Sequence, residues 1–238
     1  MTSQVNETAS HKPKLLKQPI KWLSRQIKLK AGDVLKVLGI ETVERINFAH
    51  FRGDDYVHVL DVGVADGSPD LYARFPNAAL ELFEPHPHYQ EVVEQSVLRK
   101  REARLHKVAL GDKADTALLH LKGRTGSSLV LDYGRGSVEV PVERLDTILQ
   151  PEDIRRPCLL KIDTEGYEMN VLRGAEGLLD QIDCVVVEIH FDTPQQYQPS
   201  QVIDFLSERG FVLTQILDTH VGLGMFLAGD FVFERANS

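Results

Sequence analysis

The sequence predicts an α/β fold in which a mostly parallel sheet is covered by helices on both faces. Two observations lead to this prediction. The apolar runs at 159–163 and 184–191 show little alternation of polar and apolar residues, as is usual for strands buried on both faces. Segments with the apolar spacing of helices separate such runs, and this alternation is typical of a parallel sheet.

The expected elements can be placed in order along the chain. Strands are predicted at 56–63, 78–85, 104–110, 159–163 and 184–191. Helices are predicted at 33–50, 88–101, 167–180 and 199–210. Two last strands, predicted at 211–217 and 224–235, should form an antiparallel end of the sheet. A β-rich insertion or active-site flap is predicted at 115–122 and 137–142.

Length and composition fit one catalytic domain with an N-terminal extension. The chain has 238 residues, of which 42% are hydrophobic and 26% are charged. We expect a disordered tail at 1–12, a basic helical extension at 13–53 and the main domain at 54–238. No run approaches the ~18 apolar residues of a membrane span, and the first residues lack the apolar core of a secretory signal. The expected location is the cytoplasm, with Cys158 and Cys184 as reduced packing residues.

The charge is distributed unevenly. Residues 1–30 carry a net charge of +6, although the whole chain carries −8. The acidic remainder argues against nucleic-acid binding, which depends on neutralising phosphates. Residues 14–30 mix cations with apolar residues, so this segment could contact an anionic membrane peripherally or cover the domain with a solvated basic face. The oligomeric state is left open.

Acidic residues and glycines at the ends of the first two strands indicate a nucleoside-bearing cofactor. The first strand runs into "DVGVADG", which contains Asp61, Gly63 and Gly67, and the second ends in Glu84. Glu84 follows Asp61 by 23 residues, close to the ~20-residue spacing at which an acidic residue binds ribose hydroxyls. The loop lacks the glycine spacing of a pyrophosphate site. Because Asp61 would repel pyrophosphate and tolerate a sulfonium cation, S-adenosylmethionine fits better than NAD.

An ordered series of motifs resembles the FkbM-type S-adenosylmethionine-dependent methyltransferases over residues 57–192. The motifs are "VLDVGVADG", "ELFEPHPHY", "HKVALGD", "GSSL", "VERLDTIL", "LLKIDTEGYEMNVLRGAEGLL" and "VVVEIH". The resemblance implies a seven-stranded Rossmann-like class I methyltransferase fold. It also implies O-methylation of a hydroxyl on a sugar, a glycan or a secondary metabolite.

The resemblance assigns the cofactor residues by position. Asp61, Gly63 and Gly67 would line the methionine part of the cofactor, and Glu84 would hold the ribose. The set is completed by Val108 and Ala109 beside the adenine and by Ala65 and Pro85. Ala65 departs from the family, which often has Asn at this position.

The carboxyl ends of later strands supply the catalytic candidates, namely Asp163, Glu165, Glu188 and His190. An alcohol is hardly ionised at neutral pH, so a general base is expected near the transferred methyl group. Glu188 and His190 lie two apart on a strand and should share a face. If the following helix begins near Glu165, then Glu165 and Glu168 share its sheet-facing stripe.

Other readings of these side chains stay open. Glu168 could instead cap its helix, and His190 could be a satisfied strand-end histidine. Asp163, Glu165 and Glu188 could also bind Mg²⁺, which we hold as a minority hypothesis. Ser127 and Ser128 could line the pocket or belong to a flexible flap. The rival functions are a catalytically silent methyltransferase-like subunit and an NAD-dependent oxidoreductase.

Overall fold

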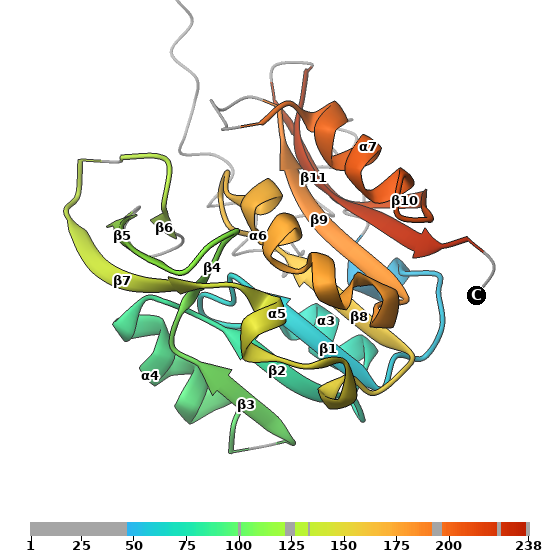
Figure 1. The fold of residues 1–238 in the computed structure, drawn as a ribbon, viewed down its shortest axis with the longest axis horizontal. Coiled ribbons are helices and arrows are strands. Elements are labelled where there is room, and N and C mark those ends of the chain that lie inside the picture. Colours follow the sequence, from blue (N-terminus) through green and yellow to red (C-terminus); the bar gives the residue numbers. More distant parts are fainter. Residues whose placement is uncertain are drawn as a thin grey trace, which may run out of the picture. The chain divides into compact units, whose positions relative to one another are not determined.

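The computed structural model describes residues 47–99, 101–121, 127–132, 134–191, 197–222 and 225–236. Figure 1 shows these residues as a ribbon. The predicted tail at 1–12 and the basic segment at 14–30 lie outside the described residues, as does most of the helix predicted at 33–50. No helix within the described ranges is long and apolar enough to cross a membrane.

A seven-stranded sheet forms the centre of the described domain, in the order β10-β11-β9-β8-β1-β2-β3. Five of its strands are parallel, and β10 and β11 pair antiparallel at one edge. The strands are β1 (His58–Val62), β2 (Ala79–Phe83), β3 (Ala103–His106), β8 (Cys158–Ile162), β9 (Cys184–His190), β10 (Phe211–Gly222) and β11 (Met225–Arg235). The predicted Rossmann-like α/β fold, including the antiparallel end of its sheet, is confirmed.

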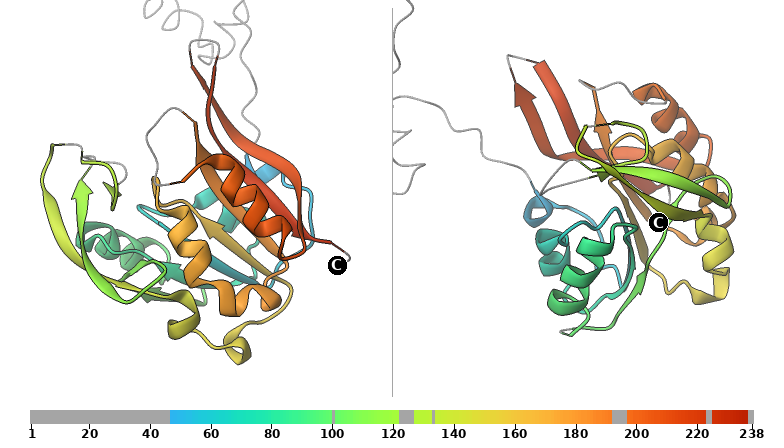
Figure 2. Two further views of the ribbon diagram at one scale, coloured as in Figure 1. Left: turned by 45° about the horizontal axis from the view of Figure 1, so that its top comes forward. Right: turned by 90° about the vertical axis from the view of Figure 1, so that its left-hand side faces the viewer.

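Helices cover both faces of this sheet (Figure 2). One face packs against α3 (Pro69–Arg74) and α4 (Pro87–Ser96), and the other against α5 (Leu145–Ile148), α6 (Glu168–Gly174) and α7 (Pro199–Ser207). Successive strand residues point to opposite faces of the sheet. Leu159 of β8 therefore packs in the core under α3 and α4, and Leu160 packs in the core under α5, α6 and α7. This two-sided burial explains why the strand sequences do not alternate.

The β-rich insertion is confirmed and forms a separate four-stranded sheet in the order β4-β7-β5-β6. Its strands are β4 (Ala109–Leu110), β5 (Asp115–Leu121), β6 (Ser127–Ser128) and β7 (Ser137–Glu143). The prediction of a single strand at 104–110 was wrong. Strand β2 ends at Phe83, which pairs with His106, so β3 loses its partner there and the chain continues as β4 in the second sheet.

Two predicted helices are shorter than expected. Helix α4 ends at Ser96, and the helix predicted at 167–180 is α6 followed by a 3-10 helix at Glu176–Gln181. Gly174 is the last residue of α6, and it must be glycine because a Cβ there would lie 1.9 Å from the carbonyl oxygen of Gly111. Gly174 and Gly177 also weaken a continuous α-helix. Helices α3 and α5 were not predicted from the sequence.

Candidate active site

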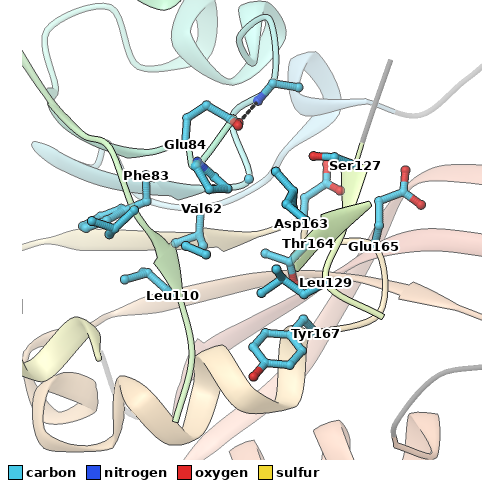
Figure 3. Close-up of a pocket in the computed structure, with 16 residues that line it drawn as sticks. Val62, Phe83, Glu84, Leu110, Ser127, Leu129, Asp163, Thr164, Glu165 and Tyr167 are labelled. Atoms are coloured by element: carbon cyan, nitrogen blue, oxygen red, sulfur yellow. Dashed lines mark hydrogen bonds between the residues drawn. The ribbon is translucent and has the colours of Figure 1, made fainter. Parts of the chain in front are cut away.

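A pocket opens at the carboxyl ends of β1, β2 and β8, where ligands of open α/β sheets bind. The second sheet supplies its other wall, as Figure 3 shows. The lining residues are Val62, Gly63, Ala65, Phe83, Glu84, Pro85, Val108, Ala109, Leu110, Leu119, Ser127, Leu129, Asp163, Thr164, Glu165 and Tyr167. Six of the eight predicted cofactor residues and two of the four catalytic candidates are therefore on the pocket wall.

Glu84 is the buried carboxylate at the end of β2. One of its oxygens accepts a hydrogen bond from the amide of Ala65 and the other from the amide of His86, both at 2.7 Å. Burial raises the pKa of Glu84 to about 7, although these two amides oppose the shift. The side chain is thus fixed in the pocket wall and changes its charge near neutral pH.

The turn after β1 brings two backbone segments unusually close. Gly63 has φ of 82°, and a Cβ at this position would lie 1.7 Å from the carbonyl oxygen of Asp163. Ala65 also has a left-handed φ, of 48°, a conformation that costs a non-glycine residue about 1–2 kcal/mol. Gly63 is therefore required first by the packing of the β1 turn against the end of β8. Gly67 lies outside the pocket lining.

Asp61 is also absent from the pocket lining. Its side chain is fully buried, and Oδ2 accepts a hydrogen bond from the Tyr72 hydroxyl at 2.6 Å. Its Oδ1 has no hydrogen-bond partner among the described residues and lies 3.7 Å from Nζ of Lys161. The structure places Asp61 behind the pocket wall, within a cluster of charged groups.

Lys161 is the centre of this cluster. It is 5% exposed, and its Nζ lies 3.0 Å from Oδ2 of Asp163. Burial alone would raise the pKa of Asp163, but the charge of Lys161 and hydrogen bonds from Glu188 and Lys161 outweigh it, so the pKa is lowered. Asp163 is therefore ionised at neutral pH on the pocket wall. The same cluster contains Asp230, whose pKa is raised to about 7 because burial outweighs the attraction of Lys161.

Glu188 and His190 share a face of β9, as predicted, and their side chains lie 2.9 Å apart. Neither residue lines the pocket, but both contact residues that line it. Glu188 is hydrogen-bonded to Asp163, and Nε2 of His190 lies 4.0 Å from a Glu165 oxygen.

Glu188 and His190 hold a proton between them. Burial and the Asp163 charge raise the pKa of Glu188, while the hydrogen bond to Glu188 raises the pKa of His190. Glu188 donates to Asp163 when Glu188 carries the proton, and it accepts from His190 when the imidazole carries the proton. The pair therefore keeps this proton above neutral pH. The pair can accept another proton only after losing this one.

Glu165 does not lie on a helix, so the predicted stripe of Glu165 and Glu168 was wrong. Helix α6 begins at Glu168, and Glu165 belongs to the preceding turn with φ of 54°. Gly166 follows with φ of 106°. These two successive residues with positive φ lie between the end of β8 at Ile162 and the start of α6, so helical periodicity does not apply to them. Glu168 is fully buried and accepts hydrogen bonds from this turn.

The remaining predicted side chains have other surroundings. Ser127 lines the pocket, and the buried Ser128 donates to the carbonyl oxygen of Glu165 at 2.7 Å. Cys158 and Cys184 are free and buried, as expected. Within the described ranges, no group of three or more His, Cys, Asp or Glu side chains is arranged to hold a metal ion. The role of Mg²⁺ stays a prediction.

A family model described as the Methyltransferase FkbM domain matches residues 61–213. The chain belongs to the FkbM methyltransferase family. The resemblance drawn from the sequence motifs is thereby confirmed. The match includes the turn after β1, Glu84, the second sheet and all four catalytic candidates.

Individual relatives of this FkbM-family chain share limited sequence identity with it. Hexuronic acid methyltransferase AglP of Haloferax volcanii is 32% identical over 73 residues, covering 31% of this chain and only 29% of that protein. Methyltransferase 1 of Beauveria bassiana is 27% identical over 192 residues, covering 69% of this chain and 75% of that protein. Magnesium protoporphyrin IX methyltransferase of Synechocystis PCC 6803, solved with bound S-adenosylmethionine, aligns over 76% of this chain and 70% of its own, at 10% identity and a TM-score of 0.44.

Several residues of the site in this FkbM-family chain were not predicted from its sequence. Lys161 could have been noticed, because a lysine inside a buried apolar strand needs carboxylate partners. Tyr72 and Tyr197, which donate to Asp61 and Glu168, had no such signal. Their hydrogen bonds join segments that are distant in the chain, and a single sequence does not reveal such pairs.

Proposed function

We propose that this FkbM-family protein transfers a methyl group from S-adenosylmethionine to a hydroxyl of a sugar, a glycan or a secondary metabolite. One observation carries the proposal. The pocket wall that holds the fixed carboxylate of Glu84 also holds ionised Asp163, which connects to the proton-sharing pair of Glu188 and His190. A carboxylate suited to ribose and a cluster that can carry a proton thus lie at the same edge of the sheet.

The residues present fit S-adenosylmethionine. A buried carboxylate is suited to accept hydrogen bonds from ribose hydroxyls, and Glu84 supplies it. Val108, Leu110 and Phe83 give apolar walls suited to an adenine ring. Bound S-adenosylmethionine supplies an electrophilic methyl group on a positively charged sulfur. The carboxylates of Asp163 and Glu165 on the same wall favour that charge.

The acceptor side is suited to a hydroxyl. Asp163 would orient the hydroxyl by accepting its hydrogen bond, because its lowered pKa keeps it ionised. The proton would then pass toward Glu188 and His190 when that pair has lost its shared proton. The Haloferax relative, named for methylating a hexuronic acid, makes a sugar hydroxyl a natural first acceptor to test.

One contact of the site does not depend on the side chain at position 65. The amide of Ala65 donates to Glu84, so this contact does not need the asparagine that the family often has here. The main chain therefore fixes the ribose-binding carboxylate whatever the side chain at this position.

The test measures S-adenosylhomocysteine formation with a panel of neutral sugars and uronic acids. Calorimetry with S-adenosylhomocysteine and with NAD runs in parallel. We expect binding of the former alone, and Asp163→Asn should bind it nearly normally while its turnover falls by ~10²-fold or more. Binding of NAD in place of S-adenosylhomocysteine would overturn the cofactor assignment. Wild-type turnover in Asp163→Asn would remove Asp163 from the mechanism.

A further inference from the structure

The turn from Asp163 to Gly166 is a strained part of the pocket wall. Glu165 has φ of 54°, a backbone conformation that a glutamate seldom adopts, and Gly166 follows with φ of 106°. Such a conformation persists only where surrounding contacts hold it. Figure 3 shows Asp163, Thr164 and Glu165 side by side on the pocket wall.

Glu168 makes most of these contacts. Its Oε1 accepts hydrogen bonds from the amide of Thr164 at 3.1 Å, the hydroxyl of Thr164 at 3.1 Å and the amide of Gly166 at 2.9 Å. Thr164 and Gly166 both precede α6, which begins at Glu168 itself. Most of the hydrogen bonds that Glu168 accepts therefore come from residues that precede its helix. Glu168 binds the turn on either side of Glu165.

Two further elements fix the same turn. The Tyr197 hydroxyl, from the segment between β9 and α7, donates to Oε2 of Glu168 at 2.6 Å, and both side chains are buried. The Ser128 hydroxyl of β6 donates to the carbonyl oxygen of Glu165 at 2.7 Å. Each residue from Thr164 to Gly166 thus has an anchor.

We propose that Glu168, held by Tyr197, is a positioning residue that fixes Glu165 in its left-handed conformation beside His190. A buried carboxylate is costly where only packing is needed, whereas it can accept several hydrogen bonds at once. Here those bonds set the backbone on both sides of Glu165, whose carboxylate lies 4.0 Å from Nε2 of His190. A role for Glu165 in catalysis rests on the proposed function, whereas its place beside His190 does not depend on that function.

The test compares Tyr197→Phe with Tyr56→Phe. Each removes one buried tyrosine hydroxyl, but Tyr56 precedes β1 at the opposite end of the strands. Amide hydrogen exchange follows residues 163–167, and NMR titration follows the His190 imidazole. In Tyr197→Phe we expect exchange of these amides to be roughly tenfold faster or more. The pKa of His190 should fall in Tyr197→Phe. It should also fall in Glu165→Gln, because the charge of Glu165 is one of the causes that raise it. Tyr56→Phe should change neither readout.

Glu168→Gln serves as a second variant, since its amide oxygen can still accept from the turn but its NH₂ group cannot accept from Tyr197. It should give the same faster exchange at 163–167. The His190 titration is not compared in this variant, because the charge of Glu168 itself raises the pKa of His190. Unchanged exchange at 163–167, or an unchanged His190 titration in Tyr197→Phe, overturns the proposal. Neither readout needs an acceptor, so a lack of methyl transfer by the wild-type protein would count against the proposed function alone.

Discussion

The amide of Ala65 donates a hydrogen bond of 2.7 Å to the carboxylate of Glu84 and so joins the turn after β1 to the end of β2. This contact places the proposed ribose-binding group at the meeting point of two neighbouring strands. Because burial raises the pKa of this carboxyl to about 7, its geometry and its charge both bear on cofactor binding.

Glu84→Gln should weaken the binding of S-adenosylhomocysteine by roughly 10- to 100-fold, since a charged hydrogen-bond acceptor is lost. Binding should also weaken in the wild type as the pH falls below about 7, because the carboxylate becomes protonated. Calorimetry between pH 6 and pH 8 measures both effects. Glu81→Gln, on the same strand but outside the pocket lining, is the control and should bind normally. Normal binding by Glu84→Gln would exclude Glu84 from the cofactor site.

Turnover should rise with pH until the pair of Glu188 and His190 loses its shared proton. The pair keeps its proton above neutral pH, so the apparent pKa of the pH–rate profile should lie above 7. Glu188→Gln removes the main cause that raises the pKa of His190, so the profile of this variant should shift to lower pH. A pH–rate profile of kcat tests this. The same profile in wild type and Glu188→Gln would contradict a role for the pair.

Asp230→Asn should stabilise the fold at alkaline pH. The folded pKa of Asp230 is about 7 against an ordinary value of 3.8, so the stability associated with its proton is present below pH 3.8 and is lost as the pH rises through 7. At pH 8 we expect the free energy of unfolding to rise by about 1–2 kcal/mol, less than the full shift because the Asn amide is also costly to bury. At pH 5 the gain should be smaller. Urea denaturation at both pH values measures it, and a loss of stability at pH 8 would contradict the prediction.

Gly63→Ala should destabilise the domain strongly, because its Cβ would overlap the carbonyl oxygen of Asp163. We expect a loss of roughly 3 kcal/mol or more. Gly67→Ala is the matched control, since Gly67 also has a positive φ but a Cβ there meets no atom closer than 3.7 Å. Chemical denaturation should show a smaller loss for Gly67→Ala. Equal losses would mean that backbone conformation, and not the contact with Asp163, dominates at Gly63.

The strands and the position of the pocket could be predicted because both follow from local patterns. Apolar runs without alternation marked buried parallel strands, and the carboxyl ends of such strands meet at one edge. Glu84, Asp163 and Glu165 therefore could be assigned to one site before the fold was known.

Other features depend on partners that are distant in the chain. The run at 104–110 divides between two sheets because β2 ends opposite His106. Asp61 turns toward Tyr72 and Lys161, and Glu168 toward Tyr197. The left-handed backbone of Glu165 depends on such contacts and has no counterpart in helical periodicity.

The division of the strands between two sheets gives the pocket two walls of different origin. Leu119, Ser127 and Leu129 come from the insertion, whereas Glu84 and Asp163 come from the ends of the central strands. Loops and insertions tolerate sequence change far better than the core that carries them. The insertion is thus the part of the pocket wall in which substitutions should be tolerated best, whereas Glu84 and Asp163 are fixed by the central sheet.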